Sequence, residues 1–309
     1  TQLMFLFLAK RLFQAVLILL GVSMITYGLL FLIPADPVRM IAGRSATAET
    51  VASIRAQLGL DQPVPIQYFR YLGSLLQGDL GRSYVQKAEV SELIVSRLPA
   101  TLQLMFAAIF FQLLIGLPAG IIASVRRNRK SDRILMILSF IGVSAPQFVV
   151  GLLLLYFFAY VLGIFPLGGY GTIAHIVLPA LTLGITIAGW YSRMIRSSMV
   201  NVLRKDYIRT ARAKGVRETR VVLVHALRNA ILPIIAMIGI DIGLYMQGVV
   251  VVESVFGWPG IGQLAWLAIQ RLDIPIILGV TLVAAVGIVV GNLLADIVTS
   301  IVDPRVRRL

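Results

Sequence analysis

Long apolar runs alternate with short charged segments along this chain of 309 residues. Several of the runs exceed about 18 residues with few or no charges, which is the length that crosses a bilayer as a helix. Prolines at the ends of or inside these runs are tolerated by lipid-embedded helices. The pattern predicts six transmembrane helices, near residues 12–33, 100–125, 134–162, 177–199, 230–252 and 275–301. We therefore expect an all-α polytopic membrane protein.

The segments between the runs suggest a division of the chain. We expect an N-terminus with the first span at residues 1–33, a long external segment at 34–99 and a transmembrane core at 100–309. A cleaved signal peptide has a shorter apolar core than the first run, which has about 22 residues and ends in "PADPV". The first run is therefore interpreted as a retained span.

Basic residues orient the spans. Of the 28 Lys and Arg, twenty lie at the N-terminus, in 126–133, in 193–228 and in the final "RVRRL", and eight lie in 34–99 and 253–274. Six spans put these two groups on opposite sides, and the positive-inside rule makes the larger group cytoplasmic. Both termini are then expected in the cytoplasm. The net charge of +14 is mainly a topology signal on this view, and nucleic acid is not expected as a partner.

The predicted external segments differ in character. Thr47 with Glu49 is expected to start a short helix, and "IQYFRYLGSLL" (66–76) is aromatic and amphipathic, which suits a membrane surface or a partner protein. The stretch 163–175 is loop-like. Residues 253–274 mix Gly, Trp and Leu, which is typical of a re-entrant or interfacial segment.

No enzyme is indicated by the chemistry of the chain. Hydrophobic residues make up 58% of it, and with no cysteine, disulfides, thiol catalysis and Cys-ligated metals are excluded. There is no G-x-x-x-x-G-K-[ST] sequence, so the chain has no P-loop of its own, and "GWPGIG" (257–262) is interpreted as a turn. His175 and His225 are isolated, and no catalytic or metal-binding set can be argued.

Polar residues inside the spans are costly and therefore informative. Two aspartates, Asp241 and Asp296, stand at membrane depth. With them we group a set of candidate pathway-lining residues: Gln112, Asp241, Gln247, Glu253, Asn292 and Asp296. Inter-helix hydrogen bonds or pathway polarity is the preferred interpretation. The alternative is a secondary transporter, driven by an ion gradient, in which Asp241 and Asp296 bind the ion.

A basic amphipathic stretch, "DYIRTARAKGVRETRVVLVHALRNA" (206–230), separates the fourth and fifth spans. Ile208, Ala211, Val222 and Leu227 fall on one side at helical spacing, among arginines. Gly215 interrupts the pattern and predicts a turn between two short helices, with Asp206 as a cap for the first. A basic helix that holds anionic lipid would explain the arginines, but small residues at the break favour insertion into a groove on another protein.

This stretch, which continues into "HALRNAILP" (225–233), resembles the coupling segment of ABC-importer permeases, most closely the dipeptide/oligopeptide/nickel branch. The general motif has Glu-Ala-Ala, three residues, Gly, then nine residues and Ile-x-Leu-Pro. Aligned on Gly215, this chain matches at Ala211 and Leu227, whereas Arg209 and Thr210 depart from it, as is typical of the peptide branch. Further motifs of the branch occur in order along nearly the whole chain: "IPADPV" (33–38), "GDLGRSY" (78–84), "LPATLQL" (98–104), "SAPQF" (144–148), "RSSM" (196–199), "ESVFGWPGIG" (253–262) and "VDPRVR" (302–307).

The resemblance implies the six-helix fold of type I importer permeases in a bacterial inner membrane. It implies four kinds of partner: a homologous second permease in a heterodimer, two cytoplasmic ATPase subunits that bind ATP and Mg, an external solute-binding protein, and membrane lipid. No cofactor or metal is expected on this chain. The coupling segment would span 203–229, with the ATPase contact at Asp206, Arg209, Thr210, Ala211, Arg212, Ala213, Lys214, Gly215 and Arg217.

Docking of the binding protein is expected on the external segment, with Arg44, Arg55 and Arg82 as candidate contacts. The solute stays open at this point among dipeptides, longer peptides, glutathione, nickel chelates and opine-like conjugates. A purely structural membrane anchor is disfavoured by the polar groups in several spans.

Overall fold

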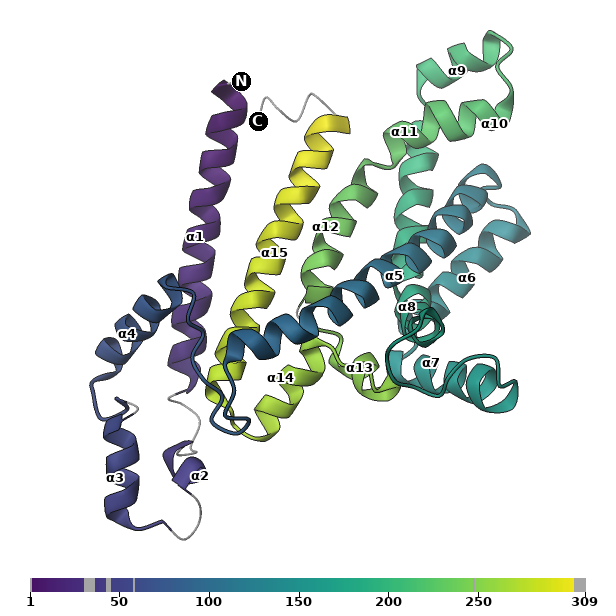
Figure 1. The fold of residues 1–309 in the computed structure, drawn as a ribbon. Coiled ribbons are helices and arrows are strands. Elements are labelled where there is room, and N and C mark those ends of the chain that lie inside the picture. Colours follow the sequence, from purple (N-terminus) through teal and green to yellow (C-terminus); the bar gives the residue numbers. More distant parts are fainter. Residues whose placement is uncertain (1, 31–36, 43–45, 58, 247, 303–309) are drawn as a thin grey trace. The chain divides into compact units, whose positions relative to one another are not determined.

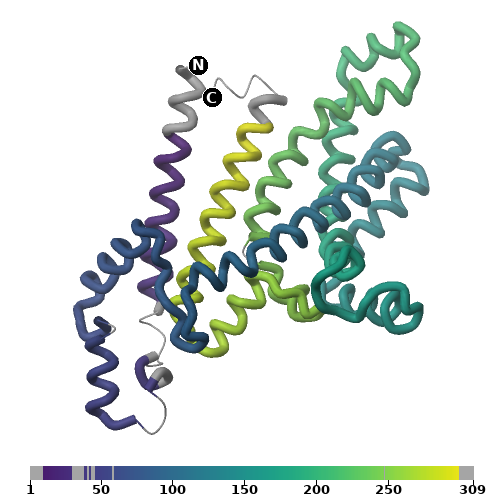
Figure 2. Tube along the Cα trace, viewed as in Figure 1, coloured from purple at the N-terminus to yellow at the C-terminus, as the bar shows by residue number. Residues whose placement is uncertain are grey.

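The computed structural model describes residues 2–30, 37–42, 46–57, 59–246 and 248–302. Helices dominate these ranges, and Arg82 and Glu89 form an isolated antiparallel bridge. Figures 1 and 2 trace the helices in chain order from purple to yellow. The chain divides into two compact units that interleave along the sequence: unit one holds residues up to Thr101, Met246–Val250 and Gly260–Gly287, and unit two holds the remainder. The division predicted at residues 33/34 and 99/100 stays a prediction.

Membrane-spanning helices occur in the number expected. In the described ranges, four helices are long and apolar enough to cross a bilayer: Lys10–Leu29, Val90–Val125, Ile173–Val202 and Ile274–Val298. Two bent pairs, Lys130–Ser144 with Gln147–Val161 and Glu218–Ala230 with Leu232–Met246, bring the number to six if each pair is one span. The predicted all-α, six-span fold class is confirmed.

Unit one contains the first span and the short helices of the predicted external segment. Its elements are α1 (Gln2–Leu30), α2 (Pro37–Ala42), α3 (Ala48–Gln57), α4 (Val64–Leu76), α14 (Ile261–Gln270) and the first parts of α5 (Val90–Val125) and α15 (Ile274–Val302). Its apolar core joins the start of α5 to α14 and α15, through Val90, Ile94, Ile261, Leu264, Ala268, Ile276 and Val280.

The two helices expected within residues 46–76 are present. The Oγ1 atom of Thr47 accepts the N–H of Thr50 at 3.2 Å and so starts α3 as predicted. Helix α4 is amphipathic and packs on α1, where the hydroxyl oxygens of Ser23 and Tyr68 lie 2.9 Å apart and the rings of Tyr27 and Tyr71 stack at 5.4 Å. Its polar and aromatic side therefore faces α1.

Unit two contains the remaining spans and the segment between the fourth and fifth. Its elements, besides the later parts of α5 and α15, are α6 (Lys130–Ser144), α7 (Gln147–Leu154), η1 (Leu155–Val161), α8 (Ile173–Val202), α9 (Asp206–Ala213), α10 (Glu218–Arg220), η2 (Val221–Ala226), α11 (Leu227–Ala230), α12 (Leu232–Met246) and α13 (Val250–Phe256). Figure 1 shows α9 and α10 folded back on one another beyond α11.

Small residues let the spans of unit two approach closely, as is typical of helices packed in a membrane. Gly116 and Gly120 of α5 face α8: a Cβ atom at Gly116 would lie 2.8 Å from Ala188 O, and one at Gly120 would overlap Ser192 O. Any larger side chain at these glycines would force α5 and α8 apart. The position of the polar groups on these helices therefore depends on glycine.

Two of the predicted spans are interrupted. The span expected at 134–162 bends by 102° between α6 and α7, because Pro146 has no N–H and Ala145 before it is extended. The span expected at 230–252 ends early at Met246, and α13 begins at Val250 after Gly248, whose φ is +84°. The six predicted spans are therefore retained only if each bent pair is counted as one span.

Candidate functional site

The segment Asp206–Ala230 forms a helical hairpin, which we call the α9–α11 hairpin. Helix α9 supplies its first arm, and α10, η2 and α11 run together as the second. The predicted break lies where expected: Gly215 has φ +74°, a left-handed conformation that glycine adopts without steric cost. The N–H of Gly215 donates to Arg212 O at 2.9 Å, and the N–H of Val216 donates to Ala211 O at 3.2 Å. This pair of bonds is the Schellman arrangement that closes a helix C-terminus.

Asp206 does not cap α9 with its side chain. It occupies the first helical turn, after Lys205 at the N-cap, and its carboxylate is exposed and lies 3.5 Å from Arg209 Nη1. An acidic residue in the first turn still interacts favourably with the helix dipole. The capping hydrogen bond predicted for Asp206 is therefore replaced by a weaker electrostatic contribution.

One face of the hairpin packs on the end of α8. Ile208, Val221, Val222 and Ala226 are buried in a cluster with three residues of α8, Tyr191, Ile195 and Met199. Ala211 and Leu227 pack against the same cluster while partly buried. The amphipathic face predicted from the spacing is confirmed. The hairpin and the last turns of α8 consequently form one packed body.

The opposite face of the hairpin is exposed. Its exposed residues include Arg209, Thr210, Arg212, Ala213, Lys214, Gly215 and Arg217. Arg212 is engaged across the turn, where its Nη2 and Nε lie 2.6 Å and 3.0 Å from the two oxygens of Glu218. Asn229 Nδ2 donates to Tyr207 Oη at 2.8 Å and ties the two arms together. Ala213 and Gly215 thus form a small-residue tip on a hairpin that is already braced internally.

A buried polar cluster joins α5, α8 and α12. Asp241 Oδ2 accepts hydrogen bonds from Gln112 Nε2 at 2.8 Å and from Tyr191 Oη at 2.5 Å, and Tyr245 Oη donates to Gln112 Oε1 at 2.8 Å. All four side chains are buried. Hydrogen bonds to a charged group typically contribute about 1.5–3 kcal/mol. The cluster therefore fixes three helices in register at one level.

The other predicted pathway residues are placed differently. Asn292 is exposed on α15, Asp296 is partly exposed one turn further on, and Gln247 lies outside the described residues. Glu253 is fully buried in α13, because the fifth span ends before it. The structure joins Gln112 to Asp241 directly. It shows no hydrogen bond for the Asn292 side chain among the residues described.

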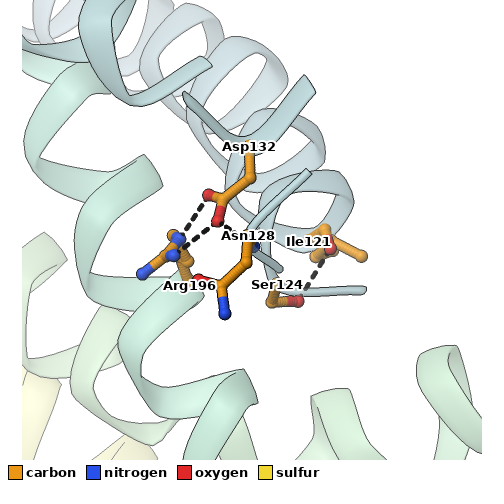
Figure 3. A network of polar contacts seen from close by, with 5 residues as sticks. All are labelled: Ile121, Ser124, Asn128, Asp132 and Arg196. Atoms are coloured by element: carbon orange, nitrogen blue, oxygen red, sulfur yellow. Dashed lines mark hydrogen bonds and ion pairs between the residues drawn. The ribbon is translucent and has the colours of Figure 1, made fainter. Parts of the chain in front are cut away.

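A second charged contact ties α6 to α8 (Figure 3). Arg196 donates to both oxygens of Asp132, from Nε and Nη2, at 2.6 Å each. Asp132 also accepts the N–H of Asn128 at 2.8 Å, so it holds the turn between α5 and α6 against α8. Ser124 Oγ donates to Ile121 O in the same turn at 2.7 Å. Arg196 lies ten residues before Asp206, where the hairpin begins.

In unit one, the predicted docking arginines have different surroundings. Arg82 is exposed, and its Nε and Nη2 donate to Lys87 O at 3.0 and 2.8 Å. Arg55 is partly buried, and Arg44 lies outside the described residues. The loop of Arg82 is held by buried Asp273, which accepts Ser83 Oγ at 2.5 Å. Burial, with Tyr27 and Asp273 nearby, raises the pKa of Tyr84 to about 12, so its hydroxyl stays neutral.

Sequence reasoning missed several members of these networks. Tyr245 follows Asp241 by one helical turn, so its place on the same face was readable. Tyr191 and the Asp132–Arg196 pair gave no local signal, because their partners lie 50 and 64 residues away along the chain.

Fold and site together define a multi-pass α-helical membrane protein with a packed hairpin between its fourth and fifth spans. Residues 116–308 match the family model described as "Binding-protein-dependent transport system inner membrane component", and residues 4–107 match the model of its N-terminal region. The chain belongs to this family. It is an inner-membrane permease subunit of a binding-protein-dependent ABC importer of the dipeptide/oligopeptide kind.

Curated relatives extend over nearly the full chain. The glutathione transport system permease protein GsiC of Salmonella paratyphi A is 42% identical over 97% of this chain and 98% of its own length. GsiC of Escherichia coli K12 is 40% identical over the same shares. Two inward-facing structures of the MetNI methionine ABC transporter match with a TM-score of 0.56, at 20% and 21% identity, over 68% and 69% of this chain and 96% and 97% of theirs. At that identity they show the fold alone, and none of the comparisons supports an ion-gradient transporter.

Proposed function

We propose that this chain forms half of a solute pathway, in a heterodimer with a homologous second permease. Both termini and the α9–α11 hairpin lie in the cytoplasm, and the 34–99 segment lies outside. Two ATPase subunits bind and hydrolyse ATP with Mg on the cytoplasmic side, and a solute-binding protein delivers the solute from outside. The family membership and the distribution of basic residues support this arrangement.

The α9–α11 hairpin is the contact with an ATPase subunit. Its exposed tip carries Ala213 and Gly215, which allow close approach of another backbone, while Ile208 anchors the hairpin to α8. A displacement of the tip is passed to α8 as a rigid-body movement, because the buried cluster leaves no space between hairpin and helix. Tyr191 belongs to that cluster and also bonds Asp241, so the movement reaches the α5–α8–α12 contact.

Outward and inward openings of the pathway must differ in affinity for the binding protein or the ATPases, since otherwise ATP could not bias them. The Gln112–Asp241 hydrogen bond joins α5 to α12, and the Tyr191–Asp241 bond adds α8 to the same arrangement. On α15, Asn292 is exposed and Asp296 is partly exposed. We assign Gln112 and Asp241 to holding the helices in register. We assign Asn292 and Asp296 to the wall of the pathway.

The binding protein docks on the 34–99 segment. Helix α4 supports this assignment, because Ile66, Phe69 and Leu76 are 48%, 70% and 84% exposed on the side away from α1. The solute is a small peptide of the glutathione class, a choice supported by the 40–42% identity to GsiC across the whole chain.

The decisive experiment places bulk at the hairpin tip. Ala213→Trp should abolish solute uptake or ATPase association while the permease still inserts and assembles, because Ala213 is exposed and helical and its own fold tolerates the change. The matched control is Arg220→Trp, which places the same bulky side chain at an exposed position on the second arm of the hairpin. Arg217→Gln should have a small effect, since exposed ion pairs contribute about 0.2–1 kcal/mol. Co-purification, hydrolysis and uptake are measured on the same importer, and normal transport by Ala213→Trp would refute the contact.

Solute identity is tested separately in vesicles that contain the complete importer, ATP inside and the binding protein outside. Labelled glutathione and a labelled neutral dipeptide compete at equal concentration. Preferred uptake of glutathione is expected. Uptake of the dipeptide alone would reassign the solute and leave the permease role intact.

A further inference from the structure

Arg193 of α8 is a charged side chain in an apolar surrounding that the transport mechanism above does not use. Its guanidinium carbon lies 4.7 Å from the ring centroid of Phe140 on α6 and 4.4 Å from that of Trp190 on α8. Its Nε and Nη2 atoms are buried and make no hydrogen bond in the described part of the chain. The aromatic faces attract the guanidinium electrostatically but leave the hydrogen-bonding capacity of Nε and Nη2 unused.

The depth of Arg193 is fixed by the helix pairing. Helices α6 and α8 run antiparallel: Asp132 pairs with Arg196, and Gly189 lies against Ser139 O. Arg193 is three residues, or about 4.5 Å, along α8 from Arg196 and so lies about one helical turn deeper than the α5–α6 turn. An arginine side chain at this depth reaches the headgroup level of the bilayer by extending toward it.

Within the described part of the chain, no acidic side chain hydrogen-bonds to the buried nitrogens of Arg193. Asp132 is the sole acidic residue in the stretches 126–144 and 185–203, and it is already occupied by both nitrogens of Arg196 and by the N–H of Asn128. The surrounding charge is strongly positive, from the exposed residues Arg126, Arg127, Arg129, Lys130 and Arg133. A counter-ion for Arg193 must therefore come from outside the chain.

The face around Arg193 is built like a lipid-facing surface. Exposed residues recur at helical spacing on both helices and mix apolar side chains with cations: Arg133, Ile137 and Phe140 on α6, and Trp190 and Ser197 beside Arg193 on α8. Phe140 and Trp190 are 56% and 54% exposed. Tryptophan is enriched at the membrane interface, which agrees with the place of Trp190 beside Arg193.

We propose that this α6–α8 face is a binding site for an anionic phospholipid, with the partly exposed side chain of Arg193 as the cation that attracts its phosphodiester and Arg133 as a second cation. The acyl chains lie along Ile137, Phe140 and Trp190. A homologous permease subunit is a poor alternative occupant, because the positive-inside rule gives its cytoplasmic ends an excess of Lys and Arg too. Basic pockets between spans on the cytoplasmic side are suited to anionic headgroups.

The first test measures lipid retention by the intact importer. The complex is reconstituted in phosphatidylcholine with a minor fraction of phosphatidylglycerol, extracted again, and its bound lipids are quantified. Arg193→Gln should lower the retained ratio of phosphatidylglycerol to phosphatidylcholine about five-fold, the factor expected for one cation at the surface. Arg193→Lys should retain part of the preference. Lys10→Gln, which removes an exposed cation at the start of another span, should leave the ratio unchanged.

The second test does not depend on an Arg193 variant folding. Brominated acyl chains quench nearby tryptophan, and the Trp190 contribution is the difference between wild type and Trp190→Phe. Brominated phosphatidylglycerol should quench it more than brominated phosphatidylcholine does, and millimolar inorganic phosphate should not abolish the difference. Equal quenching by the two lipids, displacement by inorganic phosphate, or loss of the second permease from Arg193→Gln with lipid retention unchanged would each overturn the proposal.

Discussion

Gly215 combines a left-handed backbone with open space at its Cβ position. Its φ is +74°, and no heavy atom of the described chain lies within 4 Å of a Cβ built there. Position 215 can require glycine for two different reasons. The turn demands φ above zero, whereas a tight contact with the ATPase would demand a small residue. The first reason acts on the hairpin alone, and the second acts only in the assembled importer.

Substitutions at Gly215 distinguish these reasons. Asparagine tolerates the left-handed region. For alanine, the left-handed backbone conformation costs about 1 kcal/mol. If the turn dominates, Gly215→Asn should support more ATP-driven uptake than Gly215→Ala, and Gly215→Val should support least. If size dominates, Gly215→Ala should exceed Gly215→Asn. We expect the first order from the Schellman geometry, with uptake and ATPase co-purification as the measurements.

Asp241 accepts two hydrogen bonds in the buried cluster, and an asparagine oxygen can accept both. Asp241→Asn should therefore keep substantial ATP-driven uptake, with a stability loss of about 1 kcal/mol as charged hydrogen bonds become neutral. Asp241→Leu should destabilise more, because it leaves Gln112 and Tyr191 without their acceptor. Thermal melting of the purified importer and uptake check both, with Asp296→Asn as the companion variant. Complete loss of uptake by a well-assembled Asp241→Asn would favour an ion-coupled role.

At the scale of the elements, helices α6 and α8 are joined by the Asp132–Arg196 ion pair, close to the start of the hairpin. Asp132 is 4% exposed and Arg196 26% exposed at the side chain, so the pair is largely withdrawn from water. Removing one partner leaves a poorly solvated charge, which costs about 2–3 kcal/mol for two charged hydrogen bonds.

Asp132→Asn should accordingly lower the apparent melting temperature of the importer, and it should weaken coupling between hydrolysis and uptake, because the α5–α6 turn is released from α8. Asp61→Asn, at an exposed acid of unit one, is the control. The exchanged double variant Asp132→Arg with Arg196→Asp should recover part of the loss. A melting temperature unchanged by Asp132→Asn would show that helix packing alone holds α6 on α8.

For the whole molecule, orientation is the testable property. The chain has no cysteine, so single cysteines can be introduced without background from it. Lys130→Cys should be protected from a membrane-impermeant maleimide in intact cells and labelled after lysis, whereas Gln62→Cys should be labelled from outside. Both residues are exposed in the structure. Labelling of Lys130→Cys from outside would reverse the proposed topology.

Much of this architecture follows from the sequence because it depends on local pattern. Apolar length determines which helices can cross the membrane, and the spacing of Ile208, Ala211 and Val222 with the break at Gly215 determines the hairpin. The basic residues that predict orientation are likewise a property of composition along the chain. Each of these features follows from a segment and its solvent, without knowledge of which helices meet.

The tertiary structure alone decided which groups became partners. Gln112 meets Asp241 across 129 residues, and Arg196 meets Asp132 across 64. The sequence placed Pro146 inside a predicted span, but the 102° bend between α6 and α7 was found only in the structure. Periodicity states which side chains must leave water, whereas the partner of a buried polar group depends on the register between distant helices, which close contacts such as those at Gly116 and Gly120 determine.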